Sequence, residues 1–340
     1  MRPKQISIRD VAALAGTSVG SASRVINGAP NVTPEIRAKV ERAIAALQYR
    51  PSHAAQSLRS RNSKTIGCMF SDVTNPLYGR AFRALEQRFF EAGYMLLLAN
   101  GLNDPEREIS ILNTFQLRNM DGIIIAPGNE RHLGVLEAIR KLTMPIVIYD
   151  RDIEIDADLV QYDHVEGMRA ALEYLMALGH RRIALVLWKA ESRAVRRRIE
   201  GYNATLLAAG LQIAPELLIQ VDSPTSPVLN EVTQMLNRPD APTAIIAQGT
   251  QILGSTLRAI SVSNKRVPED ISVIGFGDTD FATHYSPPLT ALRSPVESVA
   301  DYASNVLLGR IQNKQSGEST LKTFPYTLVE RDSCGPAPQK

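Results

Sequence analysis

The sequence predicts an α/β protein with a small N-terminal helix-turn-helix head and a larger core of two doubly wound lobes. Two observations predict this fold class. The first 50 residues contain three short amphipathic helical patterns, and the rest of the chain alternates β-rich runs with longer helical stretches in two successive series. With 340 residues and 44% apolar content, the chain can form more than one packed unit.

The first helix of the head is expected directly after Ser7. Its apolar residues recur with helical spacing at Ile8, Val11, Ala12 and Ala15. Asp10 stands three residues after Ser7, where a capping box places a partner for the cap. Gly16 allows the left-handed backbone that ends a helix, and Ser18 is positioned to cap the next one.

The second and third helices follow from similar signals. Ala22, Val25 and Ile26 form a small apolar stripe that Asn27-Gly28 ends. Thr33-Pro34 marks a third start, because the two residues suit a cap and a first-turn position. The buried face of the third helix is expected at Ile36, Val40, Ala43, Ile44 and Leu47. Two helices joined by a tight glycine-containing turn predict a helix-turn-helix unit.

Basic residues are concentrated at the N-terminus. Residues 1–65 contain eleven Lys and Arg against three Asp and Glu, a net charge of +8, whereas the remainder has a net charge of −5. On charge alone, a solvated surface and a surface that binds a polyanion are equally good explanations. The small residues beside Arg24 favour DNA, because they permit close entry into a major groove where Arg24 offers two donors to guanine.

Residues 51–63 are predicted to be a linker that orders only on contact, since few of them are large and apolar. Leu58 is the one sizeable apolar residue and is flanked by Arg59 and Arg61. Two interpretations stay open from the residues alone. Leu58 packs on the core, or it wedges a base step of the minor groove while the arginines neutralise phosphates.

The run IRDVAALAGTSVGSASRVING, followed by VTPEIRAKVERAIAALQYRPSHAAQSLRS, resembles the DNA-binding head and hinge of the lactose/galactose repressor (LacI/GalR) family of bacterial transcription regulators. The resemblance implies that Leu58 intercalates at the centre of a pseudo-palindromic operator. It places Val19 and Gly20 at the base-reading start of the recognition helix, although Gly20 departs from the longer side chain of many members. The expected DNA contacts are Ser7, Val19, Gly20, Ser21, Ser23, Arg24, Asn27, Ala55, Leu58 and Arg59.

The core begins near residue 64. Its first series of expected strands is TIGCMF, YMLLLA, GIIIA and PIVIY, and its second is IALVLW, ELLIQV, TAIIA and ISVIGFG. We therefore expect a DNA-binding head at 1–50, a hinge at 51–63 and an effector-binding and dimerisation core at 64–340. Within the core, lobe N is expected at about 64–160 and 291–320, and lobe C at about 161–290 and 321–332.

A ligand cleft is expected between the lobes, because doubly wound sheets bind ligands beyond the carboxyl ends of their strands. Polar residues that follow the strands are candidates to line it, with Tyr78 and Phe276 as stacking faces for a polyhydroxylated ligand. Taken singly, each is more often a solvated loop residue or a helix cap. The expected effector site is Ser71, Asp72, Tyr78, Asp150, Arg193, Arg198, Gln248, Phe276 and Asp278.

The core also resembles, more loosely, the periplasmic-sugar-binding-protein fold with which this family senses small effectors. The resemblance places Tyr78, Arg198 and Gln248 on effector contacts. Gly249 and Gly277 depart from it, because acidic residues that grip sugar hydroxyls are common at those places.

Four arginines lie within six residues, at Arg193, Arg196, Arg197 and Arg198. If two of them face the cleft, their guanidinium groups favour a carboxylate or phosphate on the ligand. We therefore expect a sugar acid or sugar phosphate in preference to a neutral sugar. The alternative is that Arg198 alone enters the cleft and the others lie along a helix surface.

The sequence also indicates several classes of protein to which the chain is not expected to belong. We find no nucleophile and base pair, no metal-ligand spacing and no phosphate loop, and GFGDTD lacks the third glycine of a dinucleotide fingerprint, so no enzyme, cofactor or metal is expected. His164 is expected at the surface, and contact with a ligand is the alternative. Cys68 and Cys334 cannot make a disulfide framework, and no apolar run reaches the roughly 18 residues of a membrane span. A cytoplasmic, nucleoid-associated bacterial protein without membrane contacts is expected.

Together these features predict a ligand-responsive transcriptional regulator, a repressor of carbohydrate or sugar-acid metabolism genes. Its expected partners are double-stranded operator DNA, a small effector (sugar, sugar acid or sugar phosphate) and a second copy of the chain. The tail DSCGPAPQK has two prolines and no leucine heptads, which favours a homodimer over a coiled-coil tetramer. The rival classes are a transport-type solute-binding protein, which lacks a helix-turn-helix, and a sugar-modifying enzyme, which needs a catalytic constellation.

Overall fold

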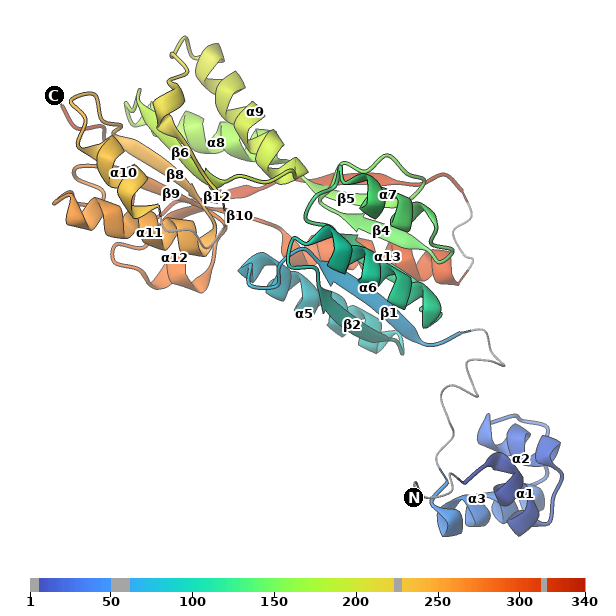
Figure 1. Ribbon diagram of the computed structural model, residues 1–340. Helices are drawn as coiled ribbons and strands as arrows, with labels where there is room; N and C mark the ends of the chain where they lie inside the picture. The colour runs from blue at the N-terminus through green and yellow to red at the C-terminus, as the bar shows by residue number, and fades with distance from the viewer. Residues whose placement is uncertain (1–5, 50–61, 223–227, 313–316, 340) are drawn as a thin grey trace. The chain divides into compact units, whose positions relative to one another are not determined.

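The computed structural model describes residues 6–49, 62–222, 228–312 and 317–339 (Figure 1). The chain forms two compact units, residues 1–63 and residues 64–340. The first unit contains the head and the second is the core. Three of the expected DNA contacts, Ala55, Leu58 and Arg59, lie outside the described residues.

The head consists of three helices, α1 (Ile8–Ala15), α2 (Val19–Ile26) and α3 (Pro34–Leu47), as predicted. They enclose a small apolar core of Val11, Ala12, Ala15, Ala22, Val25, Val40 and Ala43. The Ser18 hydroxyl accepts the N–H of Ser21 at 3.1 Å and so caps α2. Gly16 ends α1 in the left-handed conformation, with φ of 59°.

Lobe N of the core contains a six-stranded parallel sheet in the order β11-β5-β4-β3-β1-β2. Its strands are β1 (Thr65–Phe70), β2 (Met95–Asn100), β3 (Gly122–Ala126), β4 (Ile146–Tyr149), β5 (Asp158–Tyr162) and β11 (Leu321–Phe324). Its helices are α5 (Pro76–Glu91), α6 (Pro105–Leu117), α7 (Leu133–Arg140) and α13 (Val296–Ile311).

Lobe C contains a second six-stranded sheet in the order β12-β10-β9-β8-β6-β7, in which only β12 is antiparallel to its neighbour among the described strands. Its strands are β6 (Ile183–Trp188), β7 (Leu218–Val221), β8 (Ala244–Gln248), β9 (Ser272–Phe276), β10 (Thr290–Arg293) and β12 (Thr327–Val329). Its helices are α8 (His164–Ala177), α9 (Arg193–Ala208), α10 (Leu229–Leu236), α11 (Gly249–Val262) and α12 (Asp280–His284), with a 3₁₀ turn η1 (Pro215–Leu217).

Helices cover both faces of each sheet, as Figure 1 shows, and an apolar cluster fills each of the four interfaces. This arrangement explains why the central strands read as continuous apolar runs. All five residues of β3, GIIIA, are buried, because a parallel strand between two helical layers has no solvent face. The predicted α/β fold class of a helix-turn-helix head and a two-lobed, doubly wound core is confirmed.

The expected lobe limits are corrected at two places. Residues 291–320 were assigned to lobe N, but β10 belongs to the sheet of lobe C. Residues 321–332 were assigned to lobe C, but β11 pairs with β5 in lobe N, and only β12 returns to lobe C. The sequence of β11, LKTF, gave no buried-strand signal because three of its four residues are exposed on the sheet edge.

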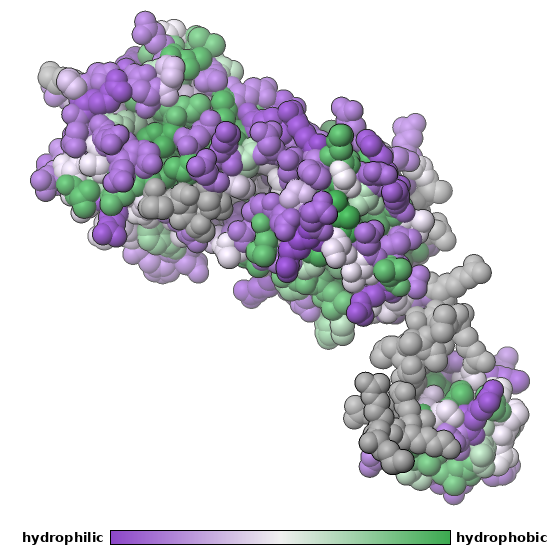
Figure 2. All heavy atoms as spheres, viewed as in Figure 1, coloured by the Kyte–Doolittle hydropathy of each residue, from purple (hydrophilic) through white to green (hydrophobic). Residues whose placement is uncertain are grey.

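The chain therefore passes between the lobes three times, after β5, β10 and β11. Figure 2 shows apolar residues in separate patches among polar ones on the visible face of the core. Across the described residues, every helix is too short or too polar to span a membrane.

Candidate functional site

The head presents an exposed polar face on α2. Gly20, Arg24 and Asn27 are exposed and recur at i, i+4 and i+7, which places them on one side of the helix. Val19, at the N-terminal end of α2, is 39% exposed. A Cβ added to Gly20 would meet only the Ser18 hydroxyl, at 3.7 Å, so the packing of the head does not require glycine there.

Ser23 does not belong to this face, and its expected outward position is wrong. It is 8% exposed and its hydroxyl accepts the side-chain amide of Asn27 at 3.3 Å. The physical reason is that Ser23 follows Ala22 by one residue, a turn of about 100°, which leaves it on the flank of the apolar stripe. A contact from the Ser23 side chain to DNA therefore has no support in the head structure.

Two further expected contacts have local partners. Ser21 is half-buried, and its hydroxyl lies 3.0 Å from that of Ser18. Ser7 is exposed and donates its hydroxyl to the Asp10 carboxylate at 2.7 Å. The Ser7 N–H donates to Asp10 at 2.8 Å and the Ser21 N–H donates to Ser18 at 3.1 Å, so a phosphate at either serine would displace a local partner.

A cavity of about 260 Å³ lies between the two lobes of the core. Eight of the nine expected effector residues line it, and Arg193 is the exception. Lobe N contributes Ser71, Asp72, Thr74, Asn75, Pro76, Leu77, Tyr78, Arg80, Asn103, Gly128, Asp150 and Arg151. Lobe C contributes Trp188, Ser192, Ala194, Arg198, Gln248, Gly249, Thr250, Gln251, Ile252, Phe276, Gly277, Asp278 and Thr279, and Ser294 lies where the chain returns to lobe N.

The lobe N wall is organised around Arg151, which follows β4. Its buried guanidinium donates to the Pro127 carbonyl at 2.5 Å, to the Tyr78 hydroxyl at 3.0 Å and to the Ser71 hydroxyl at 3.4 Å. Glu130 balances its charge, with the closest nitrogen and oxygen 4.0 Å apart. Since these groups bond to one another, this wall is fixed before any ligand arrives.

Asp150 lies beneath the same wall, in contact with His164. His164 Nε2 is 2.9 Å from the carboxylate and the Tyr326 hydroxyl is 3.1 Å from Nδ1. A carboxylate only accepts, so Nε2 carries the proton and Nδ1 accepts from Tyr326. Burial lowers the pKa of His164 to about 4, although Asp150 opposes this, and the ring is therefore neutral at pH 7.

The expected surface position of His164 is thus wrong, because its side chain is fully buried. Burial alone would raise the pKa of Asp150, but the hydrogen bond from His164 and the charges of Arg193 and Arg151 hold it below its ordinary range. Asp150 is consequently an ionised group with several partners, and its free acceptor capacity toward a ligand is small.

On the lobe C wall, the Arg198 guanidinium stacks over the Phe276 ring at 4.0 Å. Arg198 is 7% exposed, and its Nε has no hydrogen-bond partner among the described residues. Phe276 therefore presents one face to an arginine. Tyr78, the other expected stacking ring, lies parallel to Phe70 with ring centres 4.5 Å apart.

The other three arginines of the cluster do not line the cavity. Arg193 pairs with Asp150 at 3.2 Å and with Asp152 at 3.0 Å. Arg196 pairs with Glu130 and with Asp152. Arg197 pairs with residue Glu200 of its own helix at 2.8 Å. The condition for an acidic ligand, two of these four arginines in the cleft, is not met, and only Arg198 enters.

Three expected residues differ in what they can offer a ligand. Asp72 accepts the N–H and the hydroxyl of Thr74, at 3.0 and 2.9 Å. Asp278 is occupied on both oxygens, by Arg293 at 2.7 Å and Arg331 at 2.8 Å. Gln248, the N-cap of α11, has a buried Oε1 without a partner among the described residues.

Sequence reasoning missed several lining residues. Asn103, Thr250 and Thr279 each have a buried side-chain oxygen that lacks a partner in the described part of the chain. Trp188, the one tryptophan of the sequence, ends β6 beside the cavity. Trp188 was readable, because it ends an expected strand where the cleft was predicted. Asn103 and the two threonines also follow expected strands, but their unpartnered state depends on distant segments and was not readable.

Comparisons with known proteins agree with this organisation. Residues 7–52 match the model for bacterial regulatory proteins of the lacI family, and residues 172–334 match a periplasmic binding protein-like domain. The ribose operon repressor of Escherichia coli (strain K12) is 33% identical over 329 residues, covering 96% of this chain and 99% of that protein. The chain belongs to the lacI family of bacterial regulatory proteins.

Two solved structures of regulators are similar to this lacI-family chain. One is a lac repressor dimer bound to operator and the anti-inducer ONPF, with a TM-score of 0.84 and 28% identity over 97% of this chain and 99% of that one. The other is a lacI-family transcriptional regulator from Enterococcus faecium with bound ribose, with a TM-score of 0.70 and 27% identity over 80% of this chain and 99% of that one. The chain is a ligand-responsive DNA-binding regulator, and its relatives include the ribose operon repressor and the transcriptional repressor PurR of Erwinia tasmaniensis, which is 31% identical over 98% of this chain and 98% of that protein.

Proposed function

We propose that this regulator represses carbohydrate genes by binding a pseudo-palindromic operator as a homodimer, and that a neutral sugar held between its lobes changes its operator affinity. The observation that carries the proposal is the pairing of an exposed α2 face with a polar interlobe cavity in one chain. The proposed DNA contacts are Val19, Gly20, Arg24 and Asn27, with Ser7 and Ser21 toward phosphates. The relatives named above act as an operon repressor and bind an operator as a dimer.

A neutral sugar is favoured over a sugar acid or phosphate by the charge of the cavity wall. Three carboxylates, Asp72, Asp150 and Asp278, stand against three guanidinium groups, Arg80, Arg151 and Arg198. A wall with no excess positive charge has little to gain from an anion. Neutral groups that lack a partner within the described ranges, at Asn103, Gln248, Thr250 and Thr279, suit hydroxyls. A relative with bound ribose is consistent with this choice.

The surface that we propose for dimerisation is the edge strand β2. In the described sheet β2 pairs on one side only, with β1, and it exposes Met95, Leu97 and Leu98. Phe90 of the neighbouring α5 is 73% exposed. A second copy that covered this apolar edge would remove it from water and satisfy its unpaired backbone groups.

Sheared DNA from the source genome, incubated with the purified full-length chain, tests the first half of the proposal. Recovery and sequencing should enrich fragments that share one pseudo-palindromic site. The variant R24A should lose that enrichment while retaining weak general binding, because Arg24 reads a base. R42A is the matched control, since Arg42 is an exposed arginine on α3 that is not among the proposed DNA contacts. Equal recovery of all fragments by the parent would refute operator recognition.

Trp188 provides a readout for the second half. Its fluorescence is followed during titration with D-ribose, D-xylose, D-glucose, D-gluconate and D-ribose 5-phosphate, with calorimetry in parallel. We expect saturation by one of the neutral sugars, and a loss of tenfold or more in R198Q, about the cost of a charged hydrogen bond. Saturation by gluconate or the phosphate alone would restore the acidic-ligand hypothesis.

The remaining parts of the proposal concern mechanism and place. We propose that the core regulates by binding and carries out no catalysis, because its polar groups serve one another and a ligand. We also propose that the protein works in the bacterial cytoplasm, where its operator DNA lies. Incubation of each titrated sugar with the chain, followed by mass spectrometry, should return the sugar unchanged.

A further inference from the structure

The first turns of α9 carry three arginines on one face, and among the described residues lobe C provides an acidic partner for only one of them, Arg197. Arg193, Arg196 and Arg197 lie at i, i+3 and i+4 on one face of the helix, at its N-terminal end. Positive side chains at a helix N-terminus are disfavoured by the helix dipole. Within the described residues, every carboxylate paired with Arg193 and Arg196 belongs to lobe N.

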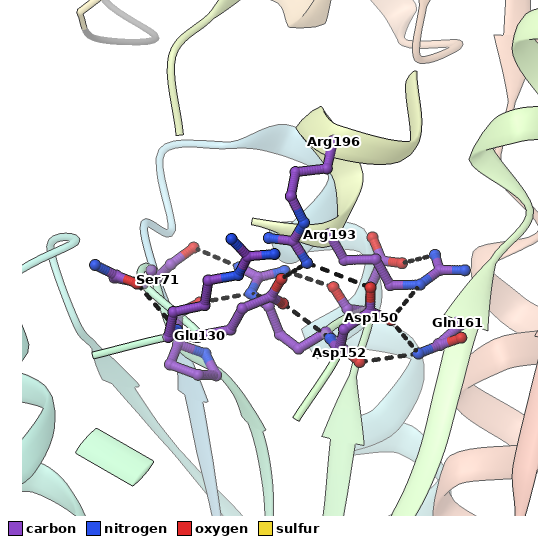
Figure 3. Close-up of polar contacts among 12 residues, drawn as sticks. Ser71, Glu130, Asp150, Asp152, Gln161, Arg193 and Arg196 are labelled. Atoms are coloured by element: carbon purple, nitrogen blue, oxygen red, sulfur yellow. Dashed lines mark hydrogen bonds and ion pairs between the residues drawn. The ribbon is translucent and has the colours of Figure 1, made fainter. Parts of the chain in front are cut away.

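The acidic partners stand on two neighbouring loops of lobe N. Glu130 follows β3, and Asp152 follows β4. The loops are tied together, because the N–H of Asp152 donates to Glu130 at 2.9 Å. Figure 3 shows Glu130, Asp150 and Asp152 grouped below the side chains of Arg193 and Arg196.

Contacts across the lobes are short, and the exposed fraction of their side chains ranges from 0% for Glu130 to 33% for Asp152. Arg193 lies 3.0 Å from Asp152, and Arg196 contacts both Asp152, at 3.3 Å, and Glu130. The exposed fraction of the side chain is 0% for Glu130, 9% for Arg193 and 27% for Arg196. A carboxylate with no exposure depends on its partners, because an unpaired buried charge is strongly destabilising.

The residues of this cluster lie on the same segments of chain as residues that line the ligand cavity. Ser192, Ala194 and Arg198 of the same α9 segment line the cavity, and so do Asp150 and Arg151 on the lobe N side. Arg193 also donates to the Tyr162 carbonyl at 2.7 Å, at the end of β5, where the chain passes between lobes. The cluster and the arginine that stacks on Phe276 therefore lie on the same first turns of α9.

We propose that Glu130 and Asp152 of lobe N, together with Arg193 and Arg196 of lobe C, form an interlobe clasp that holds the lobes closed without a ligand and positions Arg198. The clasp goes beyond the proposed function, since it concerns the lobe equilibrium and requires neither DNA nor sugar. A ligand that contacts both lobes adds to the closed arrangement that the clasp already favours. The strength of the clasp therefore sets how far ligand binding can shift the equilibrium between open and closed lobes.

Spin labels on the two lobes test the clasp in the ligand-free full-length chain. Leu133 on α7 and Leu207 on α9 are 81% and 61% exposed, and L133C/L207C places one label on each lobe. C334S removes the partly exposed native thiol, while Cys68 is buried and burial raises the pKa of its thiol. Pulsed electron–electron distance measurements should give one narrow distance distribution for this labelled parent.

In E130Q and R196Q the ratio of closed to open lobes should fall about tenfold, which adds a population at a different distance. D152N should act alike, and R196K should keep more of the narrow distribution than R196Q, because it retains a positive charge toward Glu130 and Asp152. E137Q is the control, since it removes a carboxylate from the exposed Glu137–Lys141 pair of α7 and should leave the distribution unchanged.

Folded clasp variants whose distributions superimpose on that of the parent would overturn the proposal. If a clasp variant fails to fold by circular dichroism, the labelled parent itself decides the question. Its distance distribution is compared at 0.05 M and 1 M KCl, and partly exposed ion pairs weaken with added salt. A second population that grows with salt supports the clasp, and an invariant distribution overturns it.

Discussion

Glu108 on α6 illustrates how burial changes the pKa of a single side chain. Its side chain has no solvent exposure, and one oxygen accepts the N–H of Gly128 at 2.7 Å while the other has no partner among the described residues. Gly101 makes room for it, because a Cβ there would approach Glu108 to 2.7 Å. Burial raises the pKa of Glu108 to about 7, and the Gly128 N–H and Arg151 only partly oppose this.

This pKa predicts the pH dependence of E108Q. Between the ordinary value of 4.5 and about 7, the unfolded chain loses the Glu108 proton while the folded chain keeps it, so this group destabilises the fold as pH rises. The neutral amide of Gln keeps an acceptor for Gly128 and does not titrate. Urea unfolding of the core should therefore show E108Q gaining about 1–3 kcal/mol over the parent between pH 4.5 and pH 8. A constant difference across that range would contradict the raised pKa.

The site was predictable from the sequence where a residue follows a strand and unpredictable where its partner is remote. Asp150, Gln248 and Asp278 were found because each closes or follows an apolar run whose carboxyl end faces the cavity. Arg193 was misplaced because its direction is decided by Asp152, a residue of the other lobe. Which guanidinium group faces a ligand depends on charged residues that are distant in the sequence. The spacing of arginines along one helix cannot predict those partners.

For helices and strands, the residues that begin and end an element were more informative than the intrinsic helix or strand propensity of the residues inside it. The head helices begin and end at the predicted residues because Ser18 and Gly16 satisfy backbone groups locally. The edge strand β11 was placed in the wrong lobe, because an exposed strand of four residues depends on tertiary pairing.

The cap of α2 can be tested with S18A. Loss of the 3.1 Å bond from the Ser21 N–H leaves a helix-end donor unsatisfied and should cost about 1 kcal/mol. Hydrogen exchange of residues 18–27 in the full-length chain should become roughly fivefold faster, while exchange in α13 stays unchanged. Equal exchange in both segments would mean that Ser18 contributes nothing to the cap.

Gly20 offers the opposite substitution on the same helix. Its added Cβ meets no atom closer than 3.7 Å, so G20A should stabilise α2 by about 0.5–1 kcal/mol and slow the same exchange. If Gly20 faces the floor of a major groove, the same variant should weaken operator binding although the head is more stable. A variant that gains both stability and affinity would separate Gly20 from the DNA surface.

At the scale of the whole molecule, the proposed dimer edge makes a prediction about assembly. L98D places a carboxylate on the exposed apolar edge of β2, where a second copy would bury it unpaired. Sedimentation velocity should find the parent as a dimer and L98D as a monomer. L207D is the matched control, because Leu207 is also exposed but lies on lobe C, and it should remain a dimer.

Salt dependence joins the basic head to this assembly. Residues 1–65 have a net charge of +8, so a dimer that neutralises six or more phosphates should lose on the order of a thousandfold in operator affinity between 50 and 200 mM salt. The slope of log affinity against log salt counts the phosphates that are contacted. In monomeric L98D only one head can engage, and the slope should fall to roughly half of the parent value. An unchanged slope would mean that one head alone makes every phosphate contact, and the two-headed mode of binding would have to be abandoned.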